Sequence, residues 1–64
     1  MGRTTLNKSI ISYKMRLFRS AQGIGQRELA SYLGCSVEQI CRWERSRHMP
    51  RPVWIAVMKD KGVI

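Results

Sequence analysis

The chain has 64 residues, of which 44% are hydrophobic, and twelve Lys and Arg against four Asp and Glu give it a formal net charge of +8. A domain of this length buries only about 60% of the surface of its unfolded chain, which excludes a large ligand-binding cleft or a cofactor domain. The basic charge with ordinary hydrophobic content favours a folded domain with a polyanionic partner, nucleic acid first and an anionic membrane second.

Metal, cofactor and membrane roles find little support in the composition. Cys35 and Cys41 are the only cysteines and His48 the only histidine, and their spacing matches no zinc motif. We therefore expect two buried, reduced thiols, no metal and no cofactor. The N-terminal residues lack the apolar segment of a signal peptide, and no stretch approaches the ~20 apolar residues of a membrane span. The prediction is one cytoplasmic domain over residues 1–64, without a membrane or an evident small-molecule ligand.

The first predicted element is an amphipathic helix over residues 7–22, followed by a left-handed stop at Gly23. Ile11, Met15, Phe18 and Gln22 follow the spacing of one helix face, and Ile10 and Leu17 widen its apolar stripe. Gly25 is expected to cap a second helix over residues 26–33. The inward residues of that helix are Leu29, Ala30 and Leu33.

A third helix is predicted to begin at Ser36, because Ser36 and Gln39 have the spacing of a capping box. Only Gly34, Cys35 and Ser36 separate it from the second helix, and so short a connection is typical of a helix-turn-helix, here over about residues 26–45. Ile40 and Trp43 are expected to face inward. The outward face then carries Val37, Glu38, Cys41 and Arg42, a mixture suited to reading base edges.

A basic loop over residues 45–52 precedes a last predicted helix over residues 53–59, with Pro52 in its first turn. Five of the six residues 53–58 are large apolar residues and the sixth is an alanine, more than one face of a short helix can bury in so small a domain. We therefore expect Trp54 or Val57, together with the tail Val63–Ile64, to form a homodimer interface.

Residues 19–50 resemble the lambda-repressor-like (Cro/C1, or Xre-type) helix-turn-helix domains. The resemblance rests on Gly23-Ile24-x-Gln26-x-Glu28-Leu29-Ala30, Leu33-Gly34-Cys35-Ser36, Ile40-x-x-Trp43-Glu44-Arg45 and Pro50, at mutually correct spacings. It implies an all-α fold of four to five helices. The sequence departs from the family at Gly25, where a Thr or Ser cap is usual, at Val37, where a polar residue is usual, and at Ser46, where Gly often ends the third helix.

The resemblance also implies roles for individual residues. Gln26 would contact a DNA phosphate, and Arg19 would form a partly buried salt bridge with Glu44 that serves structure and not recognition. Val37, Glu38 and Arg42 would read bases. The expected phosphate contacts are Gln26, Arg27, Ser36, Arg45, Arg47 and Arg51.

Arg42 is the strongest candidate for specificity, because its guanidinium can donate two bonds to guanine O6 and N7. Glu38 could accept from cytosine N4, steer Arg42 one turn later, or simply stabilise the start of the helix. Val37 offers only apolar contact, for instance to a thymine methyl group.

The predicted function is a sequence-specific regulator of transcription that binds double-stranded DNA through the major groove. A dimeric repressor at an inverted-repeat operator is expected, similar in size to phage or mobile-element Cro-type and anti-CRISPR-associated regulators. An antitoxin that regulates its own gene and binds a protein, or a nonspecific nucleic-acid-binding protein, are the alternatives. No carboxylate pair or Ser/His/Asp constellation indicates an enzyme.

Overall fold

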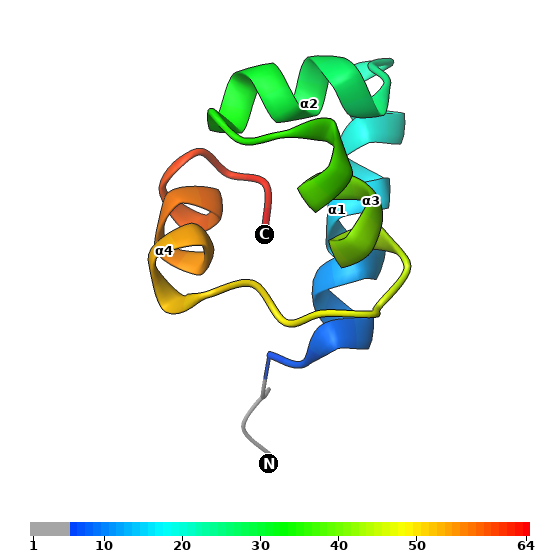
Figure 1. Cartoon of the computed structure of the whole chain (residues 1–64). Coiled ribbons are helices and arrows are strands. Elements are labelled where there is room, and N and C mark those ends of the chain that lie inside the picture. Colours follow the sequence, from blue (N-terminus) through cyan, green and yellow to red (C-terminus); the bar gives the residue numbers. More distant parts are fainter. Residues whose placement is uncertain (1–5) are drawn as a thin grey trace, which may run out of the picture.

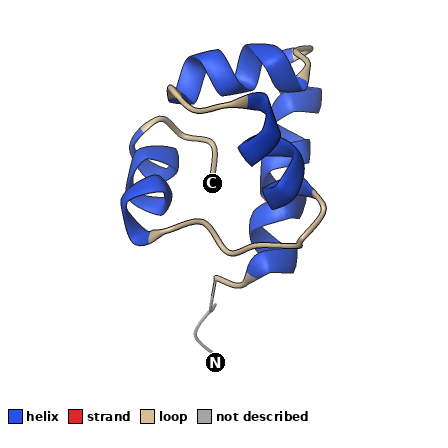
Figure 2. Ribbon diagram, viewed as in Figure 1, coloured by secondary structure: helices blue, strands red, loops and turns tan. Residues whose placement is uncertain are grey.

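The computed structural model describes residues 6–64, which form four α-helices and no strand. The helices are α1 (Lys8–Gln22), α2 (Gln26–Leu33), α3 (Val37–Glu44) and α4 (Pro52–Asp60). Figures 1 and 2 show α2 lying across one end of α1, α3 beside α1, and α4 on the opposite side of the molecule. The all-helical fold is therefore confirmed, with bounds within a residue or so of the prediction. The start of the predicted domain, residues 1–5, lies outside the described part.

The ends of α1 are fixed by an asparagine and a glycine. The Asn7 side chain accepts a hydrogen bond of 2.9 Å from the backbone N–H of Ile10, which caps the first turn. At the other end, Gly23 has φ 66°, and the backbone N–H of Ile24 donates to the carbonyl of Arg19 at 3.1 Å. The left-handed glycine ends the helix as predicted and turns the chain toward α2.

The connection between α2 and α3 consists of Gly34, Cys35 and Ser36. Gly34 has φ 82° and closes α2 by donating its N–H to the carbonyl of Ala30 at 2.8 Å. Ser36 then accepts a bond from the backbone N–H of Gln39, whose side-chain oxygen accepts one from the N–H of Ser36, both at 3.1 Å. The predicted capping box is thus formed, and it fixes where α3 begins.

The hydrophobic core draws on all four helices and on the C-terminal tail. The buried hydrophobic residues are Ile11, Met15, Leu29, Ala30, Leu33, Ile40, Trp43, Met58 and Val63. Phe18, which was expected on the inward face of the first helix, is only partly buried, and Ile24 likewise packs against the core without being fully buried. α3 packs against both α1 and α2, so its inward residues hold the two preceding helices together.

The C-terminal tail corrects the sequence prediction for Val63. Gly62 has φ 78°, which lets the chain turn back after α4, and the N–H of Val63 donates to the carbonyl of Met58 at 2.8 Å. The turn places the Val63 side chain in the core, with 3% of its surface exposed. Val63 is therefore not available to a second copy of the chain. Figure 1 shows the tail returning toward the middle of the molecule.

Candidate nucleic-acid interface

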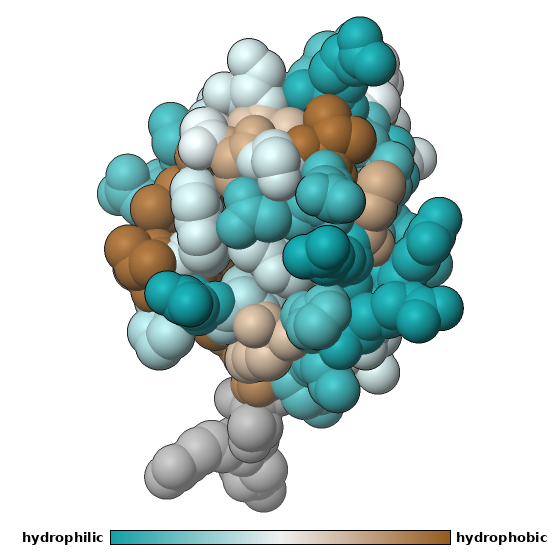
Figure 3. Space-filling model, viewed as in Figure 1, coloured by the Kyte–Doolittle hydropathy of each residue, from teal (hydrophilic) through white to brown (hydrophobic). Residues whose placement is uncertain are grey.

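The outward face of α3 presents three of the four residues expected to read bases. Val37 is 37% exposed, and the side chains of Glu38 and Arg42 are 77% and 54% exposed. A guanidinium nitrogen of Arg42 lies 3.8 Å from a carboxylate oxygen of Glu38, one helical turn away. At that distance and exposure the pair is weak, so both side chains are free to contact a partner. Figure 3 shows that the surface over α3 is mainly hydrophilic.

Cys41, the fourth residue, requires a correction. It is half-buried, and its thiol donates to the side-chain oxygen of Gln26 at 3.1 Å, so it faces the start of α2 and not open solvent. The reason is its position on α3, which packs against α2 along this side. Cys41 therefore belongs to the contact between two helices and not to the reading face.

Arg19 and Glu44, which were expected to pair, lie together between α1 and α3. The Nε and Nη2 atoms of Arg19 donate to the two carboxylate oxygens of Glu44 at 2.7 and 2.8 Å, a bidentate arrangement. Hydrogen bonding to this carboxylate raises the pKa of Arg19, against the opposing effect of burial. The pair is a structural element behind α3, as the resemblance implied.

Gln26 also joins this pair, a contact that its predicted role did not include. Its amide nitrogen donates to Glu44 at 3.0 Å while its oxygen accepts from Cys41, so both ends of the amide are bonded within the protein. A buried carboxylate has more lone pairs than one guanidinium fills, and Gln26 supplies the additional donor. The side chain of Gln26 thus aligns α2 with α3, and the phosphate contact, for which its second amide N–H is available, stays a prediction.

The remaining phosphate candidates lie on the surface around α3. The exposed ones are Arg27 at the start of α2, Ser36 at the start of α3, and Arg45, Arg47 and Arg51 in the loop that follows α3. Ser36 is occupied in the capping box, whereas no ion pair within residues 6–64 involves the four arginines. Arg45, Arg47 and Arg51 therefore bring uncompensated positive charge to the loop directly after α3, and Arg27 adds a further charge at the start of α2.

Ser46 sets the course of this loop. It has φ 60°, the left-handed conformation that favours glycine, which stands here in many members of the family that the sequence resembles. Its hydroxyl lies 2.8 Å from that of Ser12, a buried residue of α1, and 3.4 Å from the carbonyl of Lys8. These bonds hold the strained turn against α1 and fix where the arginines leave α3.

The structure adds two residues that sequence reasoning did not assign to a site. Gln39 was expected only as a capping residue and His48 was assigned no contact, yet both line a pocket with Arg42 and Arg51 between α3, the loop and α4. The spacing of Gln39 and Arg42, three residues apart on one helix, was a usable signal. The position of His48 was not predictable, because it depends on how the loop folds.

The residues expected at a homodimer interface pack largely against the core of their own chain. Trp54, Val57 and Ile64 are each partly buried against the core, and the Trp54 ring lies 5.8 Å from that of Trp43. Val53, 61% exposed, is the most exposed large hydrophobic residue of α4. Hydrophobic residues gather over α4 in Figure 3.

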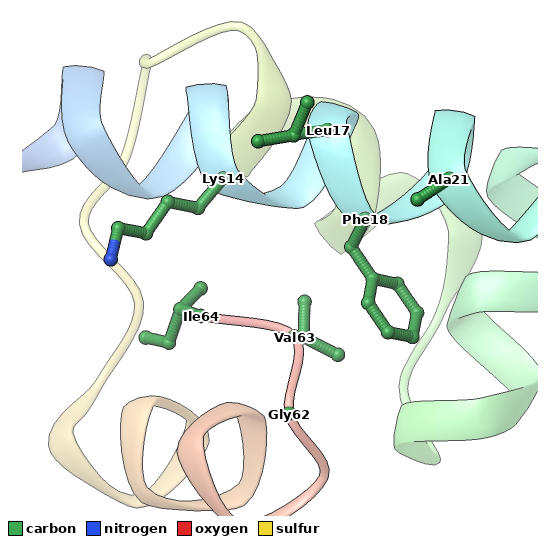
Figure 4. A pocket seen from close by; sticks show the side chains of 7 residues that line it. All are labelled: Lys14, Leu17, Phe18, Ala21, Gly62, Val63 and Ile64. Carbon is green, nitrogen blue, oxygen red and sulfur yellow. The ribbon is translucent and has the colours of Figure 1, made fainter.

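A second apolar surface lies between α1 and the tail. A groove of about 290 Å³ lies there. Figure 4 shows Lys14, Leu17, Phe18 and Ala21 on one side of it and Gly62, Val63 and Ile64 on the other. Leu17 is 53% exposed at its edge. Ile64 thus contributes to a groove as well as to the core.

Within residues 6–64, no three His, Cys, Asp or Glu side chains are grouped so that they could hold a metal ion. In the same part of the chain, no helix combines the length and the apolar character needed to cross a bilayer.

Comparisons with known proteins found no family model, no curated protein and no solved structure that matches the chain.

Proposed function

We propose that this protein is a sequence-specific regulator of transcription that binds double-stranded DNA with a lambda-repressor-like helix-turn-helix. The observation that carries the proposal is the outward face of α3, where Val37, Glu38 and Arg42 are exposed directly beside arginines that no carboxylate neutralises. An α-helix with such a face fits the major groove, whose base edges carry a distinct pattern of donors and acceptors.

The positions of the residues suggest which would read bases and which would hold phosphates. Arg42 projects from the last turn of α3 and would donate to guanine, while Glu38 one turn earlier would accept from cytosine or orient Arg42. Arg27, Arg45, Arg47 and Arg51 flank α3 on the exposed surface and would hold phosphates on either side of the groove. Neutralising about four to six phosphates would make affinity fall with salt, with a log–log slope of about −0.9 per contact.

The proposed assembly is a homodimer that represses by covering a promoter. Two copies related by a two-fold axis would place their α3 helices in successive major grooves, about 10 base pairs apart. The exposed Val53 beside Trp54 and Val57 is the apolar surface of α4 that supports such a contact.

Selection of bound sequences from random duplex DNA, followed by footprinting at two salt concentrations, tests the proposal. We expect an inverted repeat to be recovered. Arg42→Ala should then relax preference at one base position by about 1–3 kcal/mol, because it removes a base contact. Arg47→Ala is the matched control and should weaken binding to all sequences alike.

Two results would contradict the proposal. Recovery of no preferred sequence would leave only nonspecific nucleic-acid binding. Recovery of a preferred sequence without two-fold symmetry would retain DNA recognition but remove the dimer.

A further inference from the structure

The pocket between α3, the loop and α4 has a volume of about 370 Å³, within the usual range of small-ligand sites. Its polar lining consists of the side chains of Gln39, Arg42, His48 and Arg51. The residues come from three consecutive parts of the chain, α3, the loop and the start of α4, so the pocket exists only because the loop folds back beside α3.

The charge in this pocket is not balanced. No carboxylate lines it within the described residues, although Arg42 and Arg51 bring two guanidinium groups and His48 an imidazole. Of the four acidic residues of the chain, Glu44 is bound to Arg19, Glu28 accepts the backbone N–H of Gly25 at 3.1 Å, and Asp60 lies at the far end of α4. Glu38 lies 3.8 Å from Arg42 but does not line the pocket. A concave surface lined by one sign of charge concentrates ions of the opposite sign.

The other walls of the pocket are flat and apolar. Trp54 is partly exposed, Met49 is exposed, and Trp43 lies beneath them with its ring tilted against that of Trp54. An indole face and a thioether favour contact with an aromatic ring. The pocket therefore combines donors for an anion with a surface for a planar group.

We propose that this pocket binds a phosphate group attached to a planar ring, as in a nucleotide, with Arg51 and His48 donating to the phosphate, Arg42 adding positive charge on the α3 side, and Trp54 contacting the ring. Guanidinium groups match phosphate oxygens in a bidentate manner, and Gln39 can donate or accept at the rim. The phosphate can come from a free nucleotide or from a nucleotide of a DNA strand. The inference does not depend on sequence-specific DNA binding.

Tryptophan fluorescence reports on this site directly, since both tryptophans of the chain line the pocket. The full chain is titrated with adenosine monophosphate, inorganic phosphate and adenosine at constant ionic strength, so that screening does not change. We expect a saturable change with the monophosphate, a weaker one with phosphate alone, and the weakest with adenosine.

Arg51→Gln is the test variant, and Arg16→Gln, an exposed arginine of α1 outside the pocket, is the control of equal charge change. Arg51→Gln should raise the Kd of the monophosphate about tenfold, because it removes charge-assisted hydrogen bonds, and Arg16→Gln should leave it unchanged. Equal losses in both variants, or no saturable change in the unaltered chain, would overturn the proposal. Circular dichroism of each variant verifies that it is folded.

Addition of duplex DNA to the protein–monophosphate complex distinguishes the two sources of phosphate. Displacement of the nucleotide would place a DNA phosphate in the pocket, whereas simultaneous binding would assign it to a free nucleotide. A protein that binds the monophosphate but no duplex would retain this inference while the proposed function fails.

Discussion

Glu44 joins three helices through one buried carboxylate. It is 6% exposed at the end of α3 and accepts bonds from Arg19 of α1 and Gln26 of α2. A carboxylate at this depth is stable only because these donors replace water. Any change at Glu44 therefore affects the partners as much as the residue itself.

Glu44→Ala should lower the free energy of unfolding by about 3 kcal/mol, since it leaves the guanidinium of Arg19 without its partner. This loss in the free energy of unfolding is at the low end of the range for a buried ion pair because the Arg19 side chain is 23% exposed. Urea unfolding followed by circular dichroism measures the change. The double variant Arg19→Met with Glu44→Leu should recover part of the loss, and a single variant as stable as the parent would show that the pair contributes nothing.

At Ser46, the left-handed backbone conformation destabilises the fold, whereas the hydrogen bonds of the side chain stabilise it. Ser46→Ala loses the bond to Ser12 but keeps the left-handed backbone, and we expect it to cost about 1 kcal/mol. Ser46→Gly loses the same bond but relieves the strain, so it should be more stable than the alanine variant by about 1 kcal/mol. Thermal unfolding of the two variants gives the order; an alanine variant equal to the glycine variant would mean that the turn is not strained.

At the scale of the element, α2 begins with an incomplete cap. Gly25 is extended, with φ −95° and ψ −176°, and has no side chain to accept from the first turn, although Glu28 accepts its backbone N–H. A β-carbon added at Gly25 would meet the carboxylate of Glu28 at 3.0 Å. The contact is tight, but the carboxylate is the far end of a flexible side chain.

Gly25→Ser should therefore raise the free energy of unfolding by about 0.5–1 kcal/mol, from a new cap and a less flexible unfolded chain. Gly25→Ala, which adds the β-carbon without the hydroxyl, is the control that isolates the contact with Glu28. Differential scanning calorimetry compares the two. A serine variant less stable than the parent would show that the contact outweighs the cap.

For the molecule as a whole, the tail completes the core that the four helices leave open. Val63 is buried against Met58 of α4 and the other core residues, whereas Val53 on the outside of α4 is 61% exposed. The two valines therefore offer the same substitution in opposite environments.

Val63→Ala should lower the free energy of unfolding by about 2 kcal/mol, through lost burial and the cavity left behind. Val53→Ala should change it by less than about 0.5 kcal/mol, as expected for an exposed position. Chemical denaturation of both variants makes the comparison. Equal effects would mean that the tail does not pack against the core in solution.

The sequence by itself determined the helices and their ends, because these depend on neighbours along the chain. Periodicity placed α1 and α2, the glycines at 23 and 34 marked their ends, and the spacing of Ser36 and Gln39 marked the start of α3. The exposed Val37, Glu38 and Arg42 follow from the same helical spacing once Ile40 and Trp43 face inward.

Only the tertiary structure decided which groups meet across distant parts of the chain. It joined Gln26 to Glu44 and Cys41, buried Val63, and folded the loop so that His48 and Arg51 lie beside Arg42. These outcomes depend on how helices pack and on one left-handed turn at Ser46, and neither leaves a periodic signal in the sequence. The physical reason is that a helix depends on hydrogen bonds between residues close together in the sequence. Which side chains contact one another depends on burial, which sums over the whole molecule.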